Sequence, residues 1–174
     1  PMADSFNREL EWDFSNGDIT NTLTVNGTWQ IPLGTTHQRH GRGWLALLND
    51  WELSGILSFQ SGVPLMLIQS TNFNAFAGFG TQRPNLVSDP ELPRDERSAA
   101  RWFNTDAFRM APQFTLGSSS RNPVRGPGFS SIDVALVRRL PAGATTLEWR
   151  IEVFNLLNTI NFGVPNTVLG TPGF

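Results

Sequence analysis

Apolar and polar side chains alternate with a period of two along several segments of this chain. The alternation is clearest in residues 145–156, where the apolar set is Leu147, Trp149, Ile151 and Val153 and the polar set is Glu148, Arg150 and Glu152. Successive side chains of a β-strand point to opposite faces, so this spacing predicts a strand with one apolar and one polar face. Similar alternation runs through residues 20–31 and begins again at Trp51.

Further alternation, together with turn-forming residues, divides the rest of the chain. We predict an all-β chain of about five long antiparallel strands, at residues 5–14, 20–31, 51–69, 129–140 and 145–156. Turn formers in residues 15–18 and 141–144 predict hairpins. Residues 70–128 are rich in Asn, Gly, Phe and Pro and predict one long loop. Short helical signals occur only at residues 44–48 and 95–103.

The length of the predicted strands is the feature that separates two architectures. A tilted strand of about ten to twelve residues spans roughly 25 to 30 Å, which matches a bilayer core. This favours a transmembrane β-barrel of the outer-membrane kind. A soluble β-sandwich shows the same alternation, because one face meets a core and the other meets water. About five strands do not close a barrel, so we expect a partial barrel domain over residues 1–174.

A barrel assigns a direction to each face and each connection. Leu147, Trp149, Ile151 and Val153 would face lipid, and Glu148, Arg150 and Glu152 would face the polar lumen. If the turn at residues 141–144 is periplasmic, the long loop at 70–128 is extracellular. Trp29 and Trp51 would then lie at one periplasmic level as half of an aromatic girdle, the alternative being that they are ordinary core residues.

Composition narrows the class further. The chain has 174 residues, a net charge of −2 and no cysteine, which excludes disulfides and cysteine-bound metal. Arginine is scattered and balanced by acidic residues, so we expect no nucleic-acid partner. No apolar run reaches the length of about 18 residues that a membrane-spanning helix needs. The chain opens Pro1-Met2 without a signal segment, so an outer-membrane origin would require that the true N-terminus is missing.

Candidate sites for chemistry are weak. His37 and His40 are separated by Arg39 and have no acidic pair beside them, so we expect no metal site there. The acidic cluster Asp89, Glu91, Asp95 and Glu96 lacks a calcium-loop spacing and fits a solvated loop better. Glu148 and Glu152 bracket Arg150 on one strand face, which favours an ion-pair ladder over glycosidase carboxylates. We expect no catalytic residue, no metal and no cofactor.

Aromatic residues of the long loop are the remaining candidates for ligand contact. They are Phe73, Phe76 and Phe79, together with Trp102 and Phe103. Two interpretations stay open at this point. These rings form an exposed ligand-contacting surface, or they anchor the loop to the barrel rim.

Several ordered segments carry a family resemblance. Residues 50–56 read Asp-Trp-Glu-Leu-Ser-Gly-Ile and residues 60–65 read Gln-Ser-Gly-Val-Pro-Leu. Together they resemble the "GWQLSGI…QSGxPF" segment of large TonB-dependent, Oar-like outer-membrane receptors. Further segments resemble the same family in order along the chain: 83–86 with 101–105 and 107–108; 121–122 with 125–129 and Asp133; and 154–158 with 161–163, 165–166 and 170–172.

The resemblance implies the C-terminal part of a barrel of about two dozen strands, in the outer membrane of a Gram-negative bacterium. It further implies transport of an unidentified substrate, energised by the TonB complex through a plug region that this chain lacks. Two departures stand out: Ile19-Thr20-Asn21 replaces a frequent Arg-His pair, and no final strand follows Phe174. A secreted β-sandwich that binds carbohydrate and a β-rich hydrolase remain the alternatives.

Overall fold

The computed structural model describes residues 7–32, 50–78 and 80–174. The chain divides into two compact units. The strand unit consists of Asn21–Gln60 and Phe129–Ile160, and the loop unit consists of Pro1–Thr20, Ser61–Gly128 and Asn161–Phe174.

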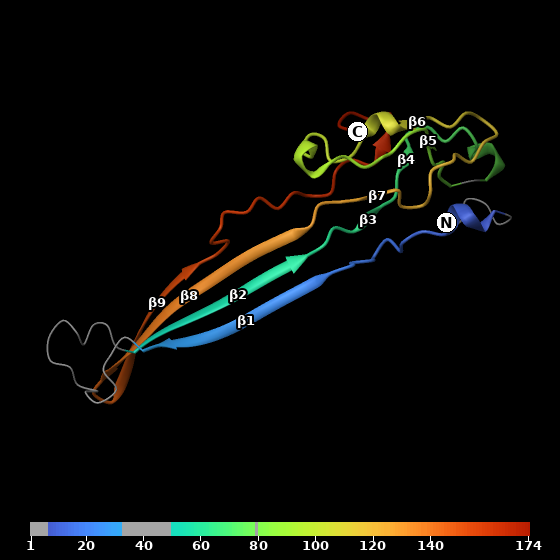
Figure 1. The fold of residues 1–174 in the computed structure, drawn as a ribbon. Helices are drawn as coiled ribbons and strands as arrows, with labels where there is room; N and C mark the ends of the chain where they lie inside the picture. Colours follow the sequence, from blue (N-terminus) through green and yellow to red (C-terminus); the bar gives the residue numbers. More distant parts are fainter. Residues whose placement is uncertain (1–6, 33–49, 79) are drawn as a thin grey trace. The chain divides into compact units, whose positions relative to one another are not determined.

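The strand unit is a four-stranded antiparallel sheet with the order β1-β2-β8-β9, visible as the long ribbons in Figure 1. Its strands are β1 (Thr22–Ile31), β2 (Trp51–Gln60), β8 (Phe129–Ala142) and β9 (Thr145–Val153). Three of them coincide, apart from their ends, with the segments expected at 20–31, 129–140 and 145–156. The alternation of β-branched and aromatic residues with polar ones therefore marks these strands correctly.

The register places side chains of the same kind opposite one another. Leu53 of β2 pairs with Trp29 of β1 on one side and with Leu136 of β8 on the other. Because directly paired residues share a face of the sheet, the alternation of each strand adds up to one continuous apolar face. We call this the apolar face; it carries Leu23, Val25, Trp29 and Ile31 from β1, Trp51, Leu53, Leu57 and Phe59 from β2, Ile132, Val134, Leu136 and Leu140 from β8, and Leu147, Trp149, Ile151 and Val153 from β9.

A two-residue turn joins β8 to β9. Ala142 pairs with Thr145, so Gly143 and Ala144 form the whole loop. Gly143 has a φ of 67°, and a positive φ at the first loop position is what a type II′ hairpin requires. Glycine suits this position because a side chain would be strained there.

The loop unit holds the small hydrophobic core of the described chain. Its core consists of Leu65, Leu67, Phe103, Ala107, Phe108 and Val124. Short strands frame it: β3 (Pro64–Leu65) pairs with β7 (Val124–Arg125), β5 (Asn85–Leu86) pairs with β6 (Phe108–Arg109), and β4 (Ile68–Gln69) lies parallel to β10 (Val168–Leu169). The single-turn 3-10 helices of this unit are η1 (Arg8–Glu11), η3 (Ala75–Ala77), η4 (Arg94–Glu96) and η5 (Thr105–Ala107).

The strand expected at residues 5–14 is wrong over its described part. Residues 8–11 form η1 instead, and no hairpin leads into β1. Long-range side-chain contacts hold this segment in place: Asn122 donates its backbone N–H to Asp13 at 2.7 Å and its side-chain amide to the Phe14 carbonyl at 2.6 Å. The Phe14 carbonyl, which a paired strand would use in its hydrogen-bond ladder, therefore already has the Asn122 amide as its partner.

The strand expected at 51–69 is also wrong beyond Gln60. The chain passes so close to Gly126 that a Cβ on Gly62 would lie 1.8 Å from the Gly126 carbonyl oxygen. Only the two-residue strands β3 and β4 follow. The sheet therefore has four long strands among the described residues rather than about five.

Helical structure is equally limited. The signal at residues 95–103 yields only η4, which ends at Glu96. The helical turn expected at residues 44–48 lies outside the described residues. In the part of the chain that the structure describes, no helix has the length and apolar character needed to cross a membrane.

Candidate functional site

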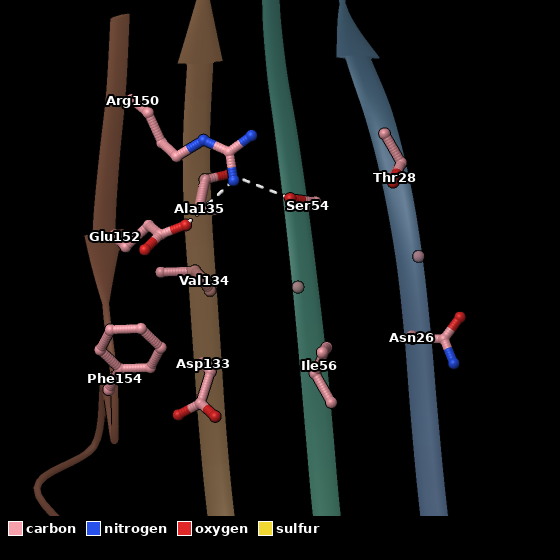
Figure 2. Close-up of a pocket in the computed structure, with 12 residues that line it drawn as sticks. Asn26, Thr28, Ser54, Ile56, Asp133, Val134, Ala135, Arg150, Glu152 and Phe154 are labelled. Atoms are coloured by element: carbon pink, nitrogen blue, oxygen red, sulfur yellow. Dashed lines mark hydrogen bonds and ion pairs between the residues drawn. The ribbon is translucent and has the colours of Figure 1, made fainter.

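A groove of about 540 Å³ lies on the polar side of the sheet. Figure 2 shows how its lining comes from all four strands, with Arg150 of β9 extending over Ala135 toward Ser54 of β2 and Glu152 lying beside Arg150. The lining residues are Asn26, Gly27, Thr28, Ser54, Gly55, Ile56, Asp133, Val134, Ala135, Arg150, Glu152 and Phe154. The groove is therefore mixed in character, with amide, hydroxyl and charged groups beside a few apolar side chains.

A ladder of ion pairs crosses the same face. Arg150 bonds Glu148 at 3.0 Å and Glu152 at 3.1 Å, both along β9. Arg139 of β8 extends the ladder, since it bonds Glu148 at 3.0 Å and Glu52 of β2 at 3.3 Å. Single exposed pairs contribute little, but alternating charges in one network support one another and fix the side chains in place.

The predicted lumen-facing set is brought together by this ladder. Glu148, Arg150 and Glu152 share one face because they lie two residues apart on β9. The sequence missed Arg139 and Glu52, which only the strand register places beside them. A second hollow of about 570 Å³ adjoins Arg139 and Glu52 and is lined by Gln30, Ile31, Pro32, Asp50, Trp51, Glu52, Val137, Arg139 and Pro141.

Asp133 is a further polar residue of this face that sequence reasoning did not assign a role. Its carboxylate accepts the Asn155 N–H at 2.7 Å and the Ser131 hydroxyl at 2.9 Å. Asn155 has a φ of 50°, and β9 ends two residues before it. Asp133 thus fixes the point where the chain leaves the sheet. In the sequence, Asn155 and Asn158 were the available signal for this turn, because asparagine tolerates a positive φ.

The predicted lipid-facing set lies together on the apolar face. Leu147, Trp149, Ile151 and Val153 are 52%, 61%, 58% and 41% exposed. Side chains of this size rarely remain exposed in a contiguous patch unless a partner or a membrane covers them. Trp51 pairs with Ile31 and Trp29 pairs with Leu53, so the two tryptophans are offset by two residues along the register.

Arg138 is the charged residue of the apolar face in the four described strands. It pairs with Trp51 and Trp149, and its guanidinium carbon lies 5.6 Å from the Trp51 ring centre. The side chain is largely buried, at 8% exposed. Contact with an aromatic ring lowers the cost of placing this cation among apolar residues.

The aromatic candidates of the long loop separate into two groups. Phe103 is 3% exposed and belongs to the core, while the Trp102 indole N–H donates to the Arg125 carbonyl at 2.8 Å. These two residues therefore pack within the loop unit itself. Phe73 and Phe76 are 39% and 68% exposed. Phe79 lies outside the described residues.

Metal-binding groups do not gather in the described ranges. No cluster of three or more His, Cys, Asp or Glu side chains occurs there. Within the acidic segment, Asp89 accepts the Glu91 N–H at 2.9 Å, and Glu91 forms an ion pair with Arg97 at 3.8 Å. His37 and His40 lie outside the described residues.

Comparison with known families identifies the class of protein to which the chain belongs. Residues 1–174 match the model of a family described as "Outer membrane beta barrel domain". The chain belongs to the outer membrane beta barrel domain family. This places it in the Gram-negative outer membrane and does not favour the secreted sandwich. No curated protein and no solved structure gives a match.

In this outer membrane beta barrel domain, the four-stranded sheet has two free edges among the described strands, at β1 and β9. A closed barrel needs at least about eight strands. An open edge inside the bilayer would leave backbone N–H and C=O groups without partners, which is strongly unfavourable. The strands that close this barrel therefore come from outside the described residues.

Proposed function

We propose that this chain is part of a TonB-dependent, Oar-like transporter that moves a substrate across the outer membrane. The proposed partners are outer-membrane lipid, an unidentified substrate and the TonB complex, which would act through a plug region. We further propose that the chain has no catalytic activity. The groove and the ion-pair ladder of the polar side support this proposal, because such a surface suits the lining of a passage.

The observation that carries the proposal is the two-sided character of the strand unit. The apolar face gathers exposed aliphatic and aromatic side chains, while the opposite face carries the groove and the ion-pair ladder. In a transmembrane barrel the first arrangement suits lipid and the second suits a hydrated lumen. The ordered motifs that resemble Oar-like receptors narrow this general picture to energised transport.

Arg138 agrees with such a position near a membrane boundary. An arginine on the lipid side costs about 2–4 kcal/mol at the bilayer midplane and about 0–1 kcal/mol near the interface. Arg138 pairs with two tryptophans, Trp51 and Trp149. Tryptophan is enriched at membrane interfaces, because its ring is apolar and its N–H is polar.

TonB coupling can be tested by direct binding. The full-length gene product, purified in detergent, is titrated with the periplasmic domain of TonB from the same organism. Because energised receptors must engage TonB, we expect saturable binding. A refolded porin of similar size serves as the control for nonspecific contact. Binding no stronger than the porin control would refute TonB coupling and leave a passive barrel.

A further inference from the structure

The groove on the polar side of the sheet is hollow because small side chains lie at its centre. Ser54 pairs with Ala135, and these two lie between Thr28 of β1 and Glu152 of β9 in one row across the sheet. The Ser54 hydroxyl donates to the Ala135 carbonyl at 3.5 Å, so it lies against the backbone. The resulting volume of about 540 Å³ is that of a small-molecule site.

Two carboxylates that line the groove each keep one oxygen uncommitted. Asp133 accepts the hydrogen bonds of Asn155 and Ser131 on the same atom, Oδ1. Glu152 bonds Arg150 through Oε1. Asp133 Oδ2 and Glu152 Oε2 have no hydrogen-bond partner among the described residues. Both oxygens can therefore accept hydrogen bonds from a ligand without breaking a contact of the sheet.

An exposed aromatic ring adjoins these two carboxylates. Phe154 is 72% exposed and follows Glu152 by two residues. Val153, the residue before it, pairs with Val134, and this places Phe154 beside Asp133 of the neighbouring strand (Figure 2). The face of an aromatic ring attracts cations. The ring and the carboxylates thus favour the same kind of ligand group.

Negative charge exceeds positive charge on the polar side of the four described strands. Its charged residues are four carboxylates and two guanidiniums, at Glu52, Asp133, Glu148 and Glu152 and at Arg139 and Arg150. Each guanidinium already bonds two of the carboxylates. A ligand anion would have to compete with them for the arginines, whereas a ligand cation meets free carboxylate oxygens. Charge complementarity therefore selects a cation.

The number and kind of groups select an organic cation over a metal ion. Calcium takes about six to eight oxygen ligands. The described residues form no cluster of three or more His, Cys, Asp or Glu side chains that could hold a metal. An alkylammonium group needs fewer acceptors, because it has three N–H donors, and its carbon atoms can contact the ring of Phe154.

We propose that this groove binds the ammonium group of a small organic cation, held by Asp133 and Glu152 and in contact with the Phe154 ring. The substrate of the transporter then carries such a group, and this second statement rests on the proposed function. The binding geometry itself depends on the strand unit alone, since that unit contains every residue of the groove lining.

The probe is n-butylammonium, added to the full-length barrel in a maltoside detergent. Saturation-transfer difference NMR with irradiation of the aromatic protons detects its contact with a ring, because neither the probe nor the detergent has aromatic protons. We expect stronger transfer to n-butylammonium than to the neutral 1-butanol or the anionic butanoate. The two uncharged or oppositely charged probes also measure partitioning into the micelle.

Carboxylate variants locate the contact. Glu152→Gln and Asp133→Asn should each lower the transfer to n-butylammonium about fivefold or more, because each removes one charged acceptor. Asn at position 133 keeps an oxygen that can accept the Asn155 N–H, and Glu152→Gln covers the case in which Asp133→Asn fails to fold. Glu96→Gln makes the same change of charge in η4 of the loop unit and should leave the transfer unchanged. Heat-modifiable gel migration verifies the fold of each variant.

Two results would overturn the ammonium site. One is equal transfer to n-butylammonium and 1-butanol in the wild type. The other is a signal for n-butylammonium that Glu152→Gln and Asp133→Asn leave at the wild-type level. Ammonium-selective transfer in a protein that does not bind TonB would refute energised transport and keep the site. TonB binding by a protein without ammonium selectivity would refute the site and keep energised transport.

Discussion

At the scale of single residues, the sequence predicted roles that depend on local spacing and missed those that depend on register. The Glu148–Arg150–Glu152 part of the ladder follows from spacing on one strand. Arg139 and Glu52 join it only because β2, β8 and β9 pair in one register. Phe114 also escaped prediction, since a phenylalanine gives no signal for a positive φ.

Phe114→Gly is expected to stabilise the folded protein by about 1 kcal/mol, because glycine adopts a positive φ without the clash that other residues incur. The ring is 78% exposed, so little packing is lost. The measurement is the urea midpoint of the barrel-to-unfolded gel shift.

Gly117→Ala is the matched opposite case. Gly117 has a φ of 80°, and a Cβ there would lie 2.1 Å from the Arg83 carbonyl oxygen. This variant should lower the urea midpoint, because the clash adds to the strain. If Phe114→Gly also lowered the midpoint, the ring contacts would outweigh the backbone strain.

At the scale of elements, alternation was a sound guide wherever a strand pairs along its whole length. It located β1, β8 and β9, and it located the first half of the segment at 51–69. It failed at 5–14, where contacts with Asn122 hold the chain in another conformation. The ends of strands depend on such long-range contacts, which no local pattern contains.

The two faces of the sheet predict responses of different size to an added charge. Ile151→Arg, on the apolar face, should destabilise the barrel by about 2–4 kcal/mol if that face meets lipid. Thr24→Arg, on the polar side of β1, should cost less than about 1 kcal/mol. Both are measured as urea midpoints in phospholipid vesicles. Equal midpoints would show that the apolar face does not contact lipid.

At the scale of the whole molecule, the sequence correctly indicated an outer-membrane barrel that the described strands do not close by themselves. It did not predict that residues 61–128 build a core of their own. The strands of that unit are two residues long, too short to show any period. Its core side chains are also scattered from Leu65 to Val124. Only their packing in three dimensions brings them together.

The orientation of the chain in the membrane can be read by labelling, because the chain has no cysteine of its own. Val87→Cys should react with a membrane-impermeant maleimide in intact cells, since we expect the long loop outside. Ala144→Cys, in the β8–β9 turn, should react only after the outer membrane is permeabilised. The parent protein without the introduced cysteine is the control, and the reverse labelling pattern would invert the proposed orientation.

The pairing of β3 with β7 has a consequence for the order of folding. Pro64 pairs with Arg125, and this continues the register in which Gln60 pairs with Phe129. Pairing β2 with β8 closes a long loop. The entropic cost of closing a loop rises by about 0.6 kcal/mol for each doubling of the loop length. If the loop unit folds first, the ends of β2 and β8 are already close together, and their pairing becomes a local step. The long loop would then be the folding nucleus, and the pairing of β2 with β8 would extend from it along the strands.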